Sequence, residues 1–165
     1  MARFTSNVTS VSAIVATAPS GATANALFAA LVAGGAGYKL RRITLGVIAG
    51  VGAPTSQQVS VGLVRTTARG TATTTLTPKP LDPNSVQTSN TTGLDTAWSA
   101  VPTATWTAPY LYQATFNTQS GVDLPYELLE ELICPTGSAN GIAFINVGNA
   151  LPTGHSYTLT VEHEE

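Results

Sequence analysis

Four carboxylate residues gathered near residue 127 are the densest group of side chains that could do chemistry. They are Asp123, Glu127, Glu130 and Glu131. Carboxylate oxygens are the ligands that Ca²⁺ and Mg²⁺ prefer, so a bound cation is one way to compensate their charge. The other ways are an ion pair with Arg41 or Arg42, from the same or a neighbouring subunit, and simple solvation. The sequence leaves these three alternatives open.

A group of aromatic residues is the best candidate for a ligand site. Its members are Trp98, Trp106, Tyr110 and Tyr112. Sugar-binding sandwiches stack pyranose rings on such side chains, and the Thr and Pro residues in between indicate an exposed loop. The alternative is that the two tyrosines belong to the core while the two tryptophans pack at a subunit boundary. We favour this second interpretation, and predict a partner interface formed by Arg41, Arg42, Trp98, Trp106, Glu127, Glu130 and Glu131.

Motifs for nucleophilic or metal-dependent catalysis do not occur in the sequence. Residues 137–141 come nearest to a nucleophile elbow, but their spacing is wrong and they read as a turn. Cys134 is the only cysteine, so no disulfide can form within the chain. We expect His155 to be solvated in a loop and His163 to have a raised pKa in the acidic C-terminal tail. The sequence therefore predicts a protein that is not an enzyme and has no metal or cofactor.

The few charged residues are strongly ordered along the chain. They make up 10% of 165 residues, against about 25% in ordinary soluble domains. All seven Lys and Arg lie at or before Lys79, and all nine Asp and Glu lie at or after Asp82. The net charge of −2 predicts no attraction to nucleic acid or to an acidic membrane. A surface with so little charge indicates either coverage by other subunits or an uncharged, soluble Thr/Ser exterior.

Strand patterns recur along the whole chain and must position these residues. Apolar residues alternate with small or polar ones in 59–63 and 157–162, and further strand patterns span 38–49, 110–116 and 141–147. We predict an all-β fold over residues 1–165: one antiparallel β-sandwich of about eight strands, jelly-roll-like. Strands from both halves are expected to pair, which would set basic strands beside acidic ones.

Three segments depart from the strand pattern. An extended Pro-rich connection is expected at about 77–93, where the prolines forbid regular pairing. One short helix is predicted near 125–132, because Pro125 suits a first helical turn and acidic residues follow it. Residues 22–32 fit either a helix or a strand, and we favour the strand. The apolar runs 13–16 and 26–33 are too short for a signal peptide or a membrane span.

The strand pattern also resembles that of small virion proteins of tailed bacteriophages. Residues 26–33 and 38–47 look like the opening strands of these proteins, and 141–146 followed by 157–162 is similar to their closing strands. The likeness covers most of the chain. Proteins of this kind include head decoration, or cement, proteins, which are often jelly rolls that sit as trimers on the capsid lattice.

This resemblance implies a structural virion protein that binds the outside of a phage capsid and stabilises the lattice through distributed non-covalent contacts. Its partners would be further copies of itself, as a homotrimer, and the major capsid protein. Its expected location is the capsid surface, after synthesis in the host cytoplasm without a signal peptide. The alternative is a carbohydrate- or receptor-binding module of a phage tail or fibre, in which Trp98 and Trp106 would contact a glycan.

Overall fold

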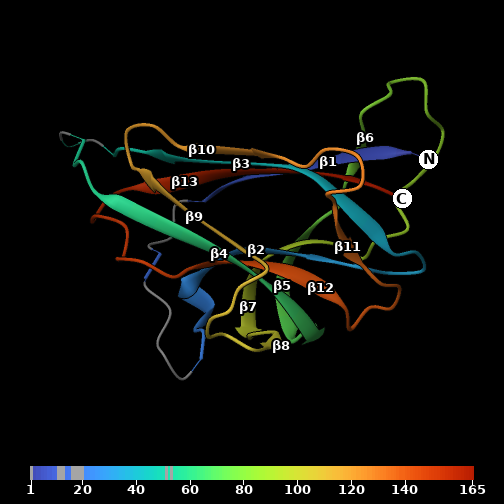
Figure 1. Cartoon of the computed structure of the whole chain (residues 1–165), viewed down its shortest axis with the longest axis horizontal. Helices are drawn as coiled ribbons and strands as arrows, with labels where there is room; N and C mark the ends of the chain where they lie inside the picture. The colour runs from blue at the N-terminus through green and yellow to red at the C-terminus, as the bar shows by residue number, and fades with distance from the viewer. Residues whose placement is uncertain (1, 11–13, 16–20, 51, 53) are drawn as a thin grey trace.

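The fold consists of two antiparallel sheets packed face to face (Figure 1). The computed structural model describes residues 2–10, 14–15, 21–50, 52 and 54–165. The first sheet contains β1 (Arg3–Ser10), β3 (Tyr38–Ile48), β6 (Lys79–Pro80), β10 (Val122–Pro125), β11 (Leu132–Cys134) and β13 (Ser156–Glu164). The second contains β2 (Leu27–Val32), β4 (Gln58–Ala68), β5 (Thr71–Leu76), β7 (Gly93–Ala100), β8 (Thr103–Ala104), β9 (Tyr112–Asn117) and β12 (Gly141–Asn146). The predicted all-β sandwich is confirmed.

Eight of these strands have the order of a jelly roll. In the first sheet β1, β13, β3 and β10 lie side by side, and in the second β2, β12, β4 and β9 do so. The chain passes between the sheets at each step from β1 to β4, which is the double Greek-key pattern of this fold. The strands β5, β7 and β8 form an insertion between β4 and β9 that widens the second sheet.

The main core lies between the sheets. In β13 every second side chain points inward, and Tyr157, Leu159 and Val161 are each at most 1% exposed. The Tyr157 ring packs edge-on against Phe28 of β2, with 5.1 Å between centroids. The Tyr157 hydroxyl also donates a hydrogen bond to the Phe28 carbonyl, so the contact joins the two sheets by packing and by a polar bond.

A second apolar cluster covers the outer face of the second sheet. Leu27, Ala30, Ala143 and Ile145 point outward from β2 and β12 and are buried there beneath Trp98 of β7. Every residue of β2 and of β12 is therefore buried, as expected for central strands with both faces covered. The strand favoured for 22–32 is confirmed for 27–32, where it follows one 3₁₀ turn, η1 (Ala24–Ala26).

The helix predicted near 125–132 is wrong. That segment is the end of β10, a loop and the start of β11, and both strands pair with β3. Pro125 lies opposite Arg42 in an edge strand, where its missing N–H costs no ladder bond. Pairing with β3 also buries Leu124 in the core, and Leu132 packs against the same core. Long-range pairing has overridden a helical signal that was purely local.

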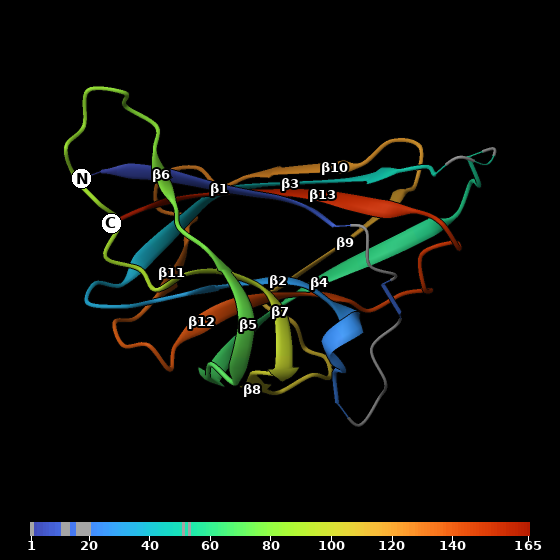
Figure 2. The same cartoon turned by 180° about the vertical axis from the view of Figure 1, so that it is seen from behind.

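The Pro-rich connection at about 77–93 is largely without regular structure and protrudes from the sandwich (Figure 2). The expectation that its prolines forbid pairing is wrong for β6, which lies beside Phe4 and Thr5 of β1. The two chain ends also meet, since the Glu165 N–H donates to the Ala2 carbonyl at 3.1 Å. Among the described residues no helix is long and apolar enough to cross a bilayer.

Candidate interaction site

A β-bulge in β3 places two successive arginines on the outer face of the first sheet. The strand β13 pairs with Leu40 and with Arg42 but skips Arg41 between them. An extra residue of this kind interrupts the alternation of a strand. Leu40 and Ile43 are therefore both buried in the core, while the two arginines between them remain outside.

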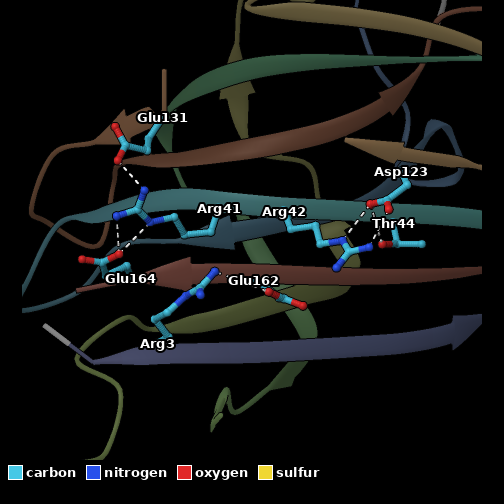
Figure 3. Close-up of polar contacts among 8 residues, drawn as sticks. All are labelled: Arg3, Arg41, Arg42, Thr44, Asp123, Glu131, Glu162 and Glu164. Carbon is cyan, nitrogen blue, oxygen red and sulfur yellow. Dashed lines mark hydrogen bonds and ion pairs between the residues drawn. The ribbon is translucent and has the colours of Figure 1, made fainter. Parts of the chain in front are cut away.

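Arg41 joins three parts of the first sheet (Figure 3). Its guanidinium forms ion pairs with Glu164 of β13 and with Glu131, the residue before β11. The Nε atom donates to Oε2 of Glu164 at 2.6 Å. The three side chains are only 11%, 9% and 4% exposed, so they form a largely buried ionic cluster. Burial alone would raise the pKa of Glu131, but backbone N–H donors and the charge of Arg41 outweigh burial and lower it.

Arg42 points the other way along the sheet, toward β10 (Figure 3). It binds Asp123 through two parallel hydrogen bonds, Nε to Oδ1 at 2.8 Å and Nη2 to Oδ2 at 2.5 Å. This hydrogen bonding lowers the pKa of Asp123, and the Thr44 hydroxyl adds a weaker donor at 3.3 Å. Both side chains of the pair are about half exposed. The pair therefore adds little to the free energy of unfolding and mainly fixes the orientation of the two side chains.

The carboxylate cluster is thus compensated in part by arginines of the same chain, one of the three alternatives left open by the sequence. Glu131 pairs with Arg41, and Asp123 pairs with Arg42. Glu127 and Glu130 are exposed, and neither has an ion pair among the described residues. The expectation that basic strands lie beside acidic ones is confirmed for β3, β10 and β13.

The loop 126–131, between β10 and β11, is fixed at both ends by this network. At its start the Tyr126 N–H donates to the Arg41 carbonyl at 2.8 Å, and the Tyr126 ring packs edge-on against Tyr112. At its end the Glu131 Oε2 atom accepts a hydrogen bond from the Leu129 N–H at 2.9 Å. Arg41 therefore holds the carboxylate that in turn holds the middle of the loop.

Two leucines form the tip of this loop and face solvent. Leu128 is 70% exposed and Leu129 is 91% exposed. Leu129 also has a φ of 76°, in the left-handed region that costs a residue with a side chain about 1–2 kcal/mol. Strained residues of this kind tend to occur at functional sites. The sequence did not point to these leucines as an exposed site, because residues 125–132 were predicted to form a helix.

The aromatic residues separate into two places. Trp98 is 7% exposed within the second apolar cluster, so its own chain accounts for its burial. Trp106 and Tyr110 are half-buried against the same cluster, and the Tyr110 hydroxyl lies 3.5 Å from the Trp106 carbonyl. Tyr112, expected in the core, is instead 39% exposed at the edge of the second sheet.

Both histidines are buried, contrary to expectation. His155 is 7% exposed, and its Nε2 atom accepts a hydrogen bond from the Thr55 N–H at 3.4 Å. His163 is fully buried, stacked on Phe4 with 5.5 Å between centroids. Burial lowers the pKa of His163, and the hydrogen bond and charge of Glu165 offset only part of this effect. The alternation of β13 carries His163 to the inside, away from Glu162 and Glu164, while its Nε2 atom stays 3.3 Å from Oε1 of Glu165.

A hollow opens on the edge of the second sheet, along β4. The strand β8 pairs with β4 at Thr66 and Ala68, whereas β9 ends its pairing at Leu63. The edge of β4 at Val64 and Arg65 is left open between them. The hollow has a volume of about 400 Å³ and is lined by Val64, Arg65, Thr67, Thr103, Ala104, Thr105, Pro109 and Leu111. We call it the β4 groove.

Comparison of the chain with protein-family models, curated proteins and solved structures found no match. The functional argument therefore depends on the fold, the ionic network and the exposed surface.

Proposed function

We propose that this chain is a structural protein of a tailed-phage virion that binds the outside of the capsid and stabilises the lattice. Its partners in this proposal are further copies of itself and the major capsid protein. The jelly-roll order of its core strands agrees with the resemblance to decoration proteins. The observation that carries the proposal is the leucine tip, which internal ion pairs hold out into solvent.

A rigid apolar tip is suited to binding another protein. Fully burying a leucine side chain contributes about 1.5–3 kcal/mol relative to leaving it in water. The loop is already ordered by Arg41, Glu131 and Tyr126, so little further ordering is lost when the tip binds. Repeated over the many copies on a particle, contacts of this size raise the free energy needed to separate capsid subunits.

The rest of the exterior fits the same role. Arg3, Arg41, Arg42 and Arg69 all pair with carboxylates of their own chain. These pairs leave a surface on which hydroxyl and small apolar groups predominate, as on the Thr-rich edge strand β5. Such a surface can be covered by a neighbouring subunit without stripping water from many charges.

The glycan-binding alternative receives less support. A sugar stacks on the exposed face of an aromatic ring, but Trp98 is buried within the second apolar cluster of its own chain. Trp106 is half-buried in the same cluster, so the two rings do not form an exposed platform.

The proposal is tested on capsids of the encoding phage prepared without this protein. Purified chain is added in increasing amounts, and the temperature at which the capsids release their DNA is recorded. We expect this temperature to rise and then level off as the sites fill. A release temperature that does not change at saturating protein would contradict a stabilising role.

A further inference from the structure

The leucine tip and the β4 groove carry matching charges. Glu127 and Glu130 flank the tip, and both are exposed without an ion pair among the described residues. Arg65 is an exposed residue lining the groove, and no described carboxylate pairs with it. Its Nη1 atom donates only to the Ile133 carbonyl, at 2.5 Å. The tip thus offers two carboxylates without a described ion pair, and the groove offers a guanidinium that no described carboxylate neutralises.

The groove also matches the tip in polarity and in size. Val64, Ala104, Pro109 and Leu111 give it apolar walls, and three threonines add hydroxyl groups. Its volume of about 400 Å³ falls within the range of about 300–1,000 Å³ found for sites that hold small ligands. Side chains such as those of Leu128 and Leu129 suit a site of this polarity.

A chain does not fill its own groove. The loop is tied to the first sheet through Arg41 and Glu131, and Leu129 remains 91% exposed. The groove lies on the second sheet, along β4. The tip of the same chain is therefore not the partner of this groove.

We propose that the Leu128–Leu129 tip of one copy docks in the β4 groove of a second copy of this chain. Glu127 or Glu130 then pairs with Arg65 across the interface, at the rim of the apolar contact. On a capsid, this contact would link neighbouring copies of the chain, and that role rests on the proposed function. It forms between copies of the chain alone, so it is testable without capsids.

The test is the mass of the purified protein, measured by light scattering and by sedimentation over a range of concentrations. The monomer has a mass of 16.9 kDa. We expect a multiple of that mass for the wild type. Arg65→Glu alone, or Glu127→Arg with Glu130→Arg, should each weaken association about tenfold or more, because like charges then meet. All three substitutions in one chain should restore association, because the charges are exchanged across the interface.

Two further variants separate docking from folding. Lys79→Glu makes the same change of charge as Arg65→Glu on an exposed residue outside the tip and the groove, and should leave the mass unchanged. Leu129→Gly removes the exposed side chain and relieves its left-handed backbone. It should abolish association while the circular dichroism of a folded β-protein is retained.

A wild type of 16.9 kDa at every concentration would overturn the inference, as would three combined substitutions that fail to restore association. A monomer that still raises the release temperature of capsids would refute this contact alone and leave the proposed function standing. The opposite result is a wild type that forms an oligomer, loses it when the charges are reversed, and does not change the release temperature of capsids. That result would refute the proposed function and leave the contact standing.

Discussion

The ion pair between Arg69 and Asp95 provides the sharpest test of how the inserted strands are attached to the jelly roll. Asp95 of β7 is 0% exposed, and its two oxygens accept hydrogen bonds from Nε and Nη2 of Arg69, each at 2.7 Å. The Thr75 hydroxyl of β5 donates a third bond, at 2.5 Å. The cluster therefore joins the turn after β4 to the inserted strands β5 and β7.

Arg69→Met should lower the free energy of unfolding by about 2–3 kcal/mol. Removing one partner of a buried pair costs about 3–5 kcal/mol, because the other charge stays buried and unpaired. We take a smaller value because the Arg69 side chain is 31% exposed, so water already screens part of the pair. Asp95→Asn should cost less, about 1 kcal/mol, since the arginine left behind can be solvated.

Urea denaturation of the two single variants and of the double variant measures these values. The double variant should be more stable than Arg69→Met alone, because the second substitution removes the buried charge. For a chain of this length, 2–3 kcal/mol corresponds to a fall of about 4–12 °C in Tm. The reasoning is refuted if Asp95→Asn costs as much as Arg69→Met, or if the two costs simply add.

Three other substitutions test the loop and the buried histidine. Arg41→Met should speed the amide exchange of the Leu129 N–H, because Glu131 loses the charge that holds it; an unchanged rate would show that Arg41 is not the anchor. Leu129→Gly should stabilise the isolated monomer by about 0.5–1 kcal/mol, since relief of left-handed strain exceeds the entropy cost of glycine, whereas Leu128→Gly as a control should destabilise it. In the wild type the stabilising effect of neutral, buried His163 is complete above its unfolded pKa of about 6.5 and declines as the pH falls toward its lower folded pKa. His163→Phe should flatten the stability profile below about pH 6.5, and urea titrations that keep the wild-type slope would contradict this.

The sequence predicted the fold class well because strand alternation is a local signal. The pattern in residues 157–162 indicated which side chains of β13 point inward, and Tyr157, Leu159 and Val161 do so. The same alternation, continued by two residues, would have placed His163 inside. The wrong prediction for His163 came from giving more weight to its acidic neighbours in sequence than to the period of the strand.

The candidate site was only partly predictable. Compensation of the acidic cluster by Arg41 or Arg42 was one of three alternatives that the sequence left open, and the structure shows it for Glu131 and Asp123. The bulge at Arg41 could not be predicted, since it arises from pairing with a strand about 120 residues later in the chain. The left-handed φ of Leu129 likewise occurs beside a hydrogen bond from its N–H to Glu131, whose carboxylate is paired with the distant Arg41.

The number of chains bound per capsid tests the central claim most directly. Capsids prepared without the protein are mixed with increasing amounts of purified chain, sedimented, and analysed for bound protein. The proposed function predicts saturation at a fixed number of copies that matches the symmetry of the lattice. Protein that stays in the supernatant at every concentration, or that binds without saturation, would contradict it.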